Sequence, residues 1–136
     1  MSKNFWLAVI IAFVLLSGME VLLHGVILDG FYKDNPQGLL PAHMTQARFH
    51  WMFVGYLILA FLWTYFFSRF ATKKDIYKGI HHGVSYMIFL HVPLSFVCYT
   101  QFRISGYIYL WWTIGGIVEG IIIGGIMGAV MREKEV

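Results

Sequence analysis

Four stretches of the chain, each roughly twenty mainly apolar residues long, constrain its fold more than any other feature. They cover residues 5–28, 48–67, 80–99 and 107–131, and polar segments separate them. A helix of about twenty apolar residues crosses the hydrocarbon core of a bilayer. The stretches lack the alternation of a membrane β-barrel, so helices are predicted. The expected fold is an all-α bundle of four transmembrane helices that forms a single membrane domain, 1–136.

The composition supports this class. Of 136 residues, 59% are apolar and 12% are charged, whereas ordinary soluble domains have about 45–50% and about 25%. A chain this short cannot bury so much apolar surface in a water-soluble fold. The lone cysteine, Cys98, excludes an intrachain disulfide. The basic residues are scattered at segment ends, which argues against nucleic acid as a partner. The expected partner is the lipid bilayer.

The distribution of lysine and arginine predicts the orientation. The connection between the second and third stretches carries four such residues, the N-terminus carries one and the C-terminus carries two. Short loops rich in Lys and Arg stay in the cytoplasm. We therefore predict cytoplasmic termini, with the segment 29–47 as an outward loop. The basic residues assigned to the cytoplasmic side are Lys3, Arg69, Lys73, Lys74, Lys78, Arg132 and Lys134.

Five ionisable side chains lie within the apolar stretches: Glu20, His24, His50, His91 and Glu119. Such groups are rare inside a membrane, face the bundle interior, and are candidate functional residues by default. Counted along the helical rise, all five fall in the outward half of the predicted bundle. Glu20 and His24 are one helical turn apart on the same face.

Three interpretations of these groups are open. In the first, they form hydrogen bonds between helices and have a purely structural role. In the second, they hold a cofactor, either haem b between paired histidines or a divalent metal ion. In the third, they form a proton or substrate path. The candidate metal ligands are Glu20, His24, His50 and His91.

A stripe of glycines marks one face of the fourth stretch. Its members are Gly116, Gly120, Gly124 and Gly128. Glycines four residues apart let another helix backbone approach closely, a pattern known as a glycine zipper. Its partner is either the first or third helix of the same chain, or a second copy or a larger membrane complex. Glu119 flanks the stripe, and a carboxyl in such a dry crevice is expected to be neutral.

Three motifs, together with the long outward loop, carry a resemblance to a known group. They are Glu20-x-x-x-His24-Gly25, the segment from Trp51 through Gly55-Tyr56, and Gly116-Ile-Val-Glu119-Gly120. Over most of its length the chain resembles a family of small, uncharacterised four-helix bacterial inner-membrane proteins. The resemblance implies the fold and the inner membrane, but no reaction. His91 departs from the pattern, in which a small residue is expected, so a cofactor site centred on His91 would be peculiar to this protein or absent.

The sequence favours a structural or accessory subunit that acts through glycine-mediated helix packing. It contains no nucleophile–base pair, phosphate loop or complete metal signature, so no independent catalysis is expected. The first alternative is a redox subunit that binds haem b or a metal through buried His and Glu. The second is a small transporter or proton path. The small multidrug transporters also have four helices and a first-helix glutamate, although the surrounding residues differ.

Overall fold

The computed structural model describes residues 2–34, 36–39, 42–72 and 74–132. These residues are mainly helical, and no strand occurs among them. The predicted flanking residues Lys73 and Lys134 lie outside the described ranges. In chain order the elements are α1 (Lys3–Leu22), the π-helical segment η1 (Leu23–Ile27), α2 (Asp29–Asp34), the 3-10 turn η2 (Pro36–Gly38), α3 (Ala42–Phe70), α4 (Ile76–Gln101) and α5 (Gly106–Val130).

Within the described ranges, four helical segments are long and apolar enough to cross a membrane. They are Lys3–Ile27, His43–Phe70, Ile76–Gln101 and Gly106–Val130. Large apolar side chains cover the outside of the bundle, and Trp51 and Phe89 are 66% and 76% exposed. Hydrocarbon rather than water suits such a surface. The prediction of an all-helical protein with four apolar helices is therefore confirmed, and the chain has the features of an integral membrane protein.

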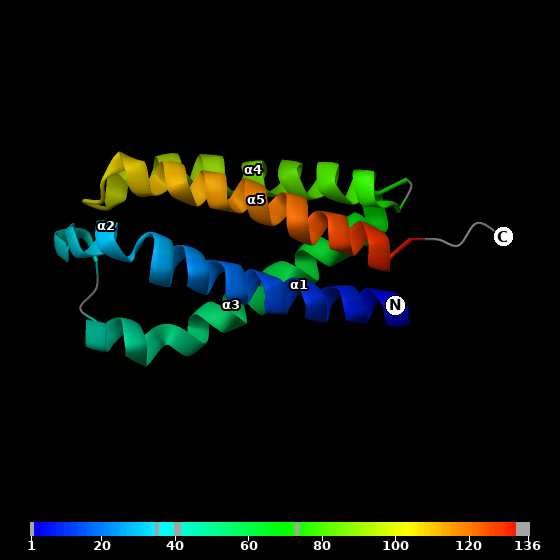
Figure 1. Ribbon diagram of the computed structural model, residues 1–136, viewed down its shortest axis with the longest axis horizontal. Coiled ribbons are helices and arrows are strands. Elements are labelled where there is room, and N and C mark those ends of the chain that lie inside the picture. The colour runs from blue at the N-terminus through cyan, green and yellow to red at the C-terminus, as the bar shows by residue number, and fades with distance from the viewer. Residues whose placement is uncertain (1, 35, 40–41, 73, 133–136) are drawn as a thin grey trace.

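The helices run up and down, so the start of α1 and the end of α5 lie at one end of the bundle (Figure 1). We call this the termini end, and we call the opposite end, which holds α2, the α2 end. α4 packs mainly against α5, and α3 packs mainly against α1. α1 also contacts α5 and so joins the two pairs. α3 crosses the bundle obliquely, and its first half diverges from α4 and α5 (Figure 1).

A local signal explains where α4 begins. The Asp75 side chain accepts a hydrogen bond from the Lys78 N–H at 2.8 Å and caps α4, which starts at Ile76. α3 starts at Ala42, inside the segment 29–47 that was predicted as a loop. The predicted boundary differs because hydropathy marks the part of a helix that crosses the membrane and not where the helix ends. The same segment contains α2, where Lys33 pairs with Asp29 one turn away at 2.6 Å.

α4 and α5 approach each other through glycines. A Cβ added at Gly83 would overlap the carbonyl oxygen of Gly120, and one added at Gly79 would overlap that of Gly124. Gly128 also lies against the first residues of α4 and would leave no room for a Cβ. Close backbone approach stabilises helix pairs in lipid, where hydrophobicity does not draw helices together. Three glycines of the stripe are therefore covered by the third membrane-spanning helix of the same chain.

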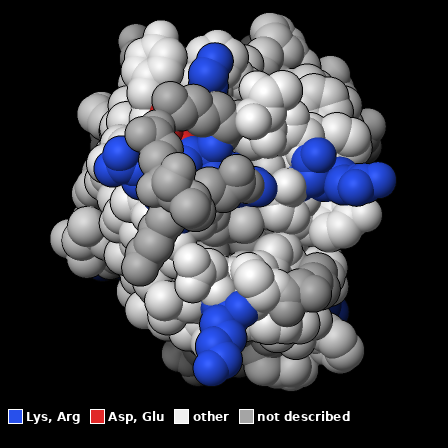
Figure 2. Space-filling view, turned by 90° about the vertical axis from the view of Figure 1, so that its right-hand side faces the viewer, with Lys and Arg blue, Asp and Glu red and all other residues white. Residues whose placement is uncertain are grey.

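The interior changes character along the bundle. Toward the termini end it is mainly apolar, and Trp63, Phe67 and Met87 are completely buried there, as is the polar side chain of Thr64. Figure 2 shows the termini end itself, where Lys and Arg side chains spread over the surface and very little Asp or Glu is visible. The buried carboxyls of Glu20 and Glu119 belong to residues farther toward the α2 end. The apolar core thus closes the polar interior on the termini side.

Candidate functional site

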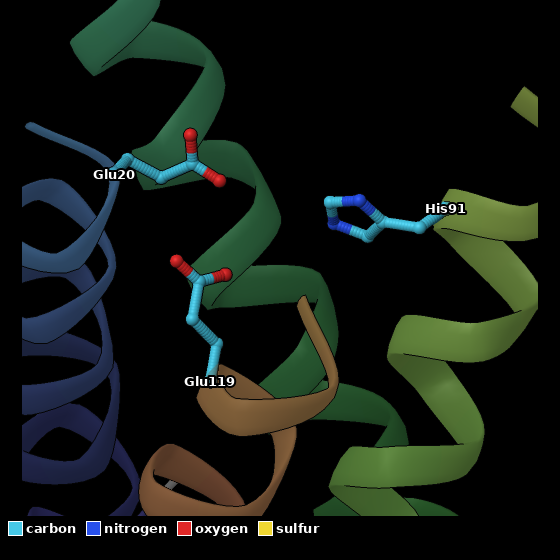
Figure 3. Close-up of side chains that lie close together, drawn as sticks. All are labelled: Glu20, His91 and Glu119. Atoms are coloured by element: carbon cyan, nitrogen blue, oxygen red, sulfur yellow. The ribbon is translucent and has the colours of Figure 1, made fainter. Parts of the chain in front are cut away.

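Three helices bring ionisable side chains to one place inside the bundle. Glu20 comes from α1, His91 from α4 and Glu119 from α5, and the three point toward a common space with α3 behind it (Figure 3). Each offers one ligand atom, and these atoms lie within 4.8 Å of one another. Glu20 is 9% exposed and Glu119 is 1% exposed. The predicted set therefore converges for these three members.

The Glu119 side chain is almost completely buried. Both of its carboxylate oxygens are buried, and neither has a hydrogen-bond partner among the described residues. A buried polar group without a partner costs roughly 1–3 kcal/mol, and a charged one costs more. Protonation removes the charge but still leaves an O–H donor and a carbonyl oxygen unsatisfied. The environment of Glu119 therefore favours a ligand that the side chain binds directly.

Gly116 makes room for the imidazole of His91. A Cβ added at Gly116 would lie 2.8 Å from Cδ2 and 2.9 Å from Nε2 of His91, which is closer than van der Waals contact allows. Gly116 thus has a different neighbour from the other glycines of the stripe, because it faces a side chain where they face a backbone. The small residue on α5 lets the ring from α4 reach the space beside Glu119.

Glu20 is held from two sides. Its Oε2 atom accepts a hydrogen bond from the Tyr56 hydroxyl of α3 at 3.2 Å. The same oxygen lies 2.9 Å from Nε2 of His24, one turn farther along the chain. Both contacts use one carboxylate oxygen, so the other remains available to a ligand.

His24 in turn contacts α2 and α5. Its Nδ1 atom lies 2.5 Å from the hydroxyl of Tyr32, and that hydroxyl accepts a hydrogen bond from Trp112 Nε1 at 2.8 Å. The His24 and Tyr32 rings are parallel, with centroids 5.8 Å apart. Tyr32 lies outside the four membrane-spanning segments, and burial is the largest cause that raises its pKa to about 12. Tyr32 is therefore a neutral phenol at physiological pH.

His50 does not join the group. It is exposed on the first half of α3, and its ring packs against that of Trp51 at a centroid distance of 5.2 Å. This half of the helix diverges from α4 and α5, so the predicted depth of His50 does not bring it to the others (Figure 1). His24 contacts the group through Glu20. The expected five-residue cluster is thus three convergent groups, one supporting histidine and one peripheral histidine.

Three residues of the network were not among the predicted site residues. Tyr56, Tyr32 and Trp112 provide its remaining hydrogen bonds. Tyr56 follows Glu20 by 36 positions and Trp112 follows Tyr32 by 80. No local motif links positions so far apart. Only the rule that a buried carboxylate needs donors suggests that a tyrosine or tryptophan completes the site.

The donor set suits a small divalent ion better than a haem. A six-coordinate haem b needs two axial ligands on opposite faces of the porphyrin, whereas the convergent group contains one imidazole beside two carboxylates. Carboxylates suit Mn²⁺ and harder cations, and imidazole suits Fe, Co, Ni, Cu and Zn ions. A mixed set of this kind selects divalent ions of the first transition row. Neighbouring ligands around tetrahedral Zn²⁺ are about 3.4 Å apart, given bonds of about 2.0–2.1 Å.

No protein-family model, curated protein or solved structure matches the chain.

Proposed function

We propose that the protein is an integral membrane protein that binds one divalent transition-metal ion between α1, α4 and α5. Glu20, His91 and Glu119 are the ligands. The observation that carries the proposal is the Glu119 carboxylate, which is buried, has no hydrogen-bond partner among the described residues and faces the other two donors (Figure 3). A bound cation would coordinate one of these oxygens and balance the charge of the carboxylate.

Charge supports a divalent ion in particular. Two carboxylates carry a charge of −2 when ionised, and a neutral imidazole adds none. A divalent cation makes the group neutral, which suits a low-dielectric interior where an isolated charge is very costly. A monovalent cation leaves one negative charge in the bundle. A proton on each carboxyl gives neutrality, but it leaves the Glu119 oxygens without partners.

The spacing of the donors supports a site that is largely assembled before the ion arrives. The ligand atoms lie within 4.8 Å of one another, against about 3.4 Å around a tetrahedral ion. Small rotations about the flexible Glu side chains close this difference. Three protein ligands leave a fourth position open for water or a substrate group, as in catalytic zinc sites.

We further propose that the basic termini end faces the cytoplasm (Figure 2). The residues that support this orientation are Lys3, Arg69, Lys74, Lys78 and Arg132. The ion site then lies in the outward half of the bundle. A location in the bacterial inner membrane rests on the family resemblance alone. The glycine stripe gives little support to a docking role, because α4 of the same chain covers Gly120, Gly124 and Gly128.

Titration of the purified protein in detergent micelles tests the proposal. Calorimetry with Zn²⁺, and visible absorption with Co²⁺, are expected to show one ion per chain. His91→Ala is expected to weaken binding by at least about 100-fold, because loss of a ligand exceeds the 10–100-fold cost of losing a supporting contact. His50→Ala is the matched control, since His50 is exposed and outside the group, and it should bind as the wild type does. Equal losses in the two variants, or no binding by the wild type, would contradict the proposal.

A further inference from the structure

The contacts of His24 extend beyond the proposed ligands and form a chain of hydrogen bonds that ends at the half-buried Trp112. We infer that Trp112 and Tyr32 hold His24 in its Nε2–H tautomer, and that His24 thereby positions the Glu20 carboxylate for the ion. His24 is thus a positioning residue rather than a ligand. The positioning role rests on the proposed function, whereas the tautomer does not.

The direction of the hydrogen bonds in this series follows from its first member, Trp112. An indole N–H only donates, so the Tyr32 oxygen accepts from Trp112 at 2.8 Å. The Tyr32 phenol keeps its own proton at neutral pH, and Nδ1 of His24, 2.5 Å away, is placed to accept it. With Nδ1 acting as the acceptor, the proton of a neutral imidazole resides on Nε2.

The contact made by Nε2, the other ring nitrogen of His24, agrees with this assignment. Nε2 of His24 lies 2.9 Å from Oε2 of Glu20, which also accepts from the Tyr56 hydroxyl. An Nε2–H group donates to this oxygen and completes the chain. The opposite tautomer places a bare nitrogen against a carboxylate oxygen, which is a repulsive contact between two acceptors. Each donor in the chain therefore has one acceptor only when His24 carries its proton on Nε2.

The consequence for the site is that one edge of Glu20 is occupied. His24 and Tyr56 both bind Oε2, which leaves Oε1 as the oxygen for the ion. Contacts of this kind orient a ligating carboxylate and maintain its charge, and their loss typically weakens metal binding by 10–100-fold. The His24 ring is stacked on Tyr32 and also packs near Trp112, so its plane is restrained as well.

The backbone builds this arrangement from a local irregularity. His24 lies in η1, where the helix widens to π-helical hydrogen bonding before α2 begins at Asp29. The Leu28 N–H bonds to the Leu23 carbonyl at 2.8 Å and closes this wide turn. Single π turns inside α-helices frequently occur at functional sites. Here the wide turn precedes the short helix that brings Tyr32 back over His24.

Two measurements test the inference. Nitrogen NMR of histidine-labelled protein without metal is expected to show the Nε2–H tautomer for His24, identified by loss of its signal in His24→Gln. In Zn²⁺ titrations, His24→Ala should bind 10–100-fold more weakly, whereas His24→Gln should retain most of the affinity because its amide N–H can still donate to Glu20. Tyr32→Phe should lie between these variants. Tyr77→Phe is the matched control, since Tyr77 is 73% exposed at the opposite end of the bundle.

The outcomes separate the two proposals. Failure of the folded wild type to bind an ion contradicts the proposed function and the positioning role with it. Normal ion binding together with an Nδ1–H signal in the metal-free protein, or with unchanged affinity in His24→Ala, overturns this inference alone. A Zn²⁺-induced shift of His24 Nε2 like that of His91 also overturns it, because His24 would then be a ligand.

Discussion

Gly116 and His91 face each other across the α4–α5 contact, and the imidazole occupies the space that a side chain at position 116 would take. The first prediction follows from this pair. Gly116→Ala should push the His91 ring away from Glu20 and Glu119 and weaken Zn²⁺ binding by about tenfold or more, since ligands displaced by a fraction of an ångström bind poorly. Gly18→Ala is the control, because a Cβ there meets nothing within 4 Å. Unchanged affinity in Gly116→Ala would count against His91 as a ligand.

The second prediction concerns the backbone contacts between α4 and α5. Gly83→Ala and Gly124→Ala should each lower the free energy of unfolding by about 1–3 kcal/mol, because the added methyl group meets backbone atoms that cannot move aside. Unfolding in mixed micelles with increasing denaturing detergent measures this. Gly18→Ala should remain within about 1 kcal/mol of the wild type. If all three variants were equally stable, the α4–α5 contact would be looser than described.

The third prediction separates stability from function at Glu119. Glu119→Leu removes two buried oxygens that have no hydrogen-bond partner among the described residues. The variant should therefore raise the unfolding free energy of the metal-free protein by about 1–3 kcal/mol while abolishing ion binding. Thermal melts with and without Zn²⁺ measure both effects, and the ion should stabilise the wild type only. A destabilised metal-free variant would show that Glu119 has a structural partner.

The fourth prediction concerns Tyr32, whose pKa is raised to about 12 from the usual value of 10.0. The folded protein holds this proton more tightly than the unfolded chain does. The stability linked to Tyr32 is therefore complete below pH 10 and is lost as the pH rises toward 12. The difference in tyrosinate absorbance between the wild type and Tyr32→Phe should titrate with a midpoint near pH 12. A difference that titrates near pH 10 would place the phenol in water.

The fold was largely predictable because length and hydropathy determine which helices can cross a bilayer. Residues 5–28, 80–99 and 107–131 correspond to α1 with η1, α4 and α5, within a few residues at each end. α2 could not be predicted, because its six residues are mostly polar and carry no hydrophobic period. The tilt of α3 depends on packing against α1, which no local pattern encodes.

The sequence predicts how deep the site residues lie in the bundle, but not how each helix is rotated about its own axis. Glu20, His91 and Glu119 were all expected in the same half of the bundle, and the structure brings them together. His50 was expected with them, but the divergence of α3 leaves it on the surface. The contact of Tyr32 with His24 and Trp112 needs the wide turn of η1, and the residues Leu23–Ile27 contain no signal that specifies it.

The most direct test of the central claim is an anomalous-difference map from crystals of the protein grown with Zn²⁺. We expect one strong peak per chain among the Glu20 and Glu119 carboxylates and the His91 imidazole, at about 2.0–2.2 Å from one atom of each. The matched crystal of His91→Ala should lack the peak. Zinc found only at exposed histidines such as His50 or His81, with the space between α1, α4 and α5 empty, would contradict the account.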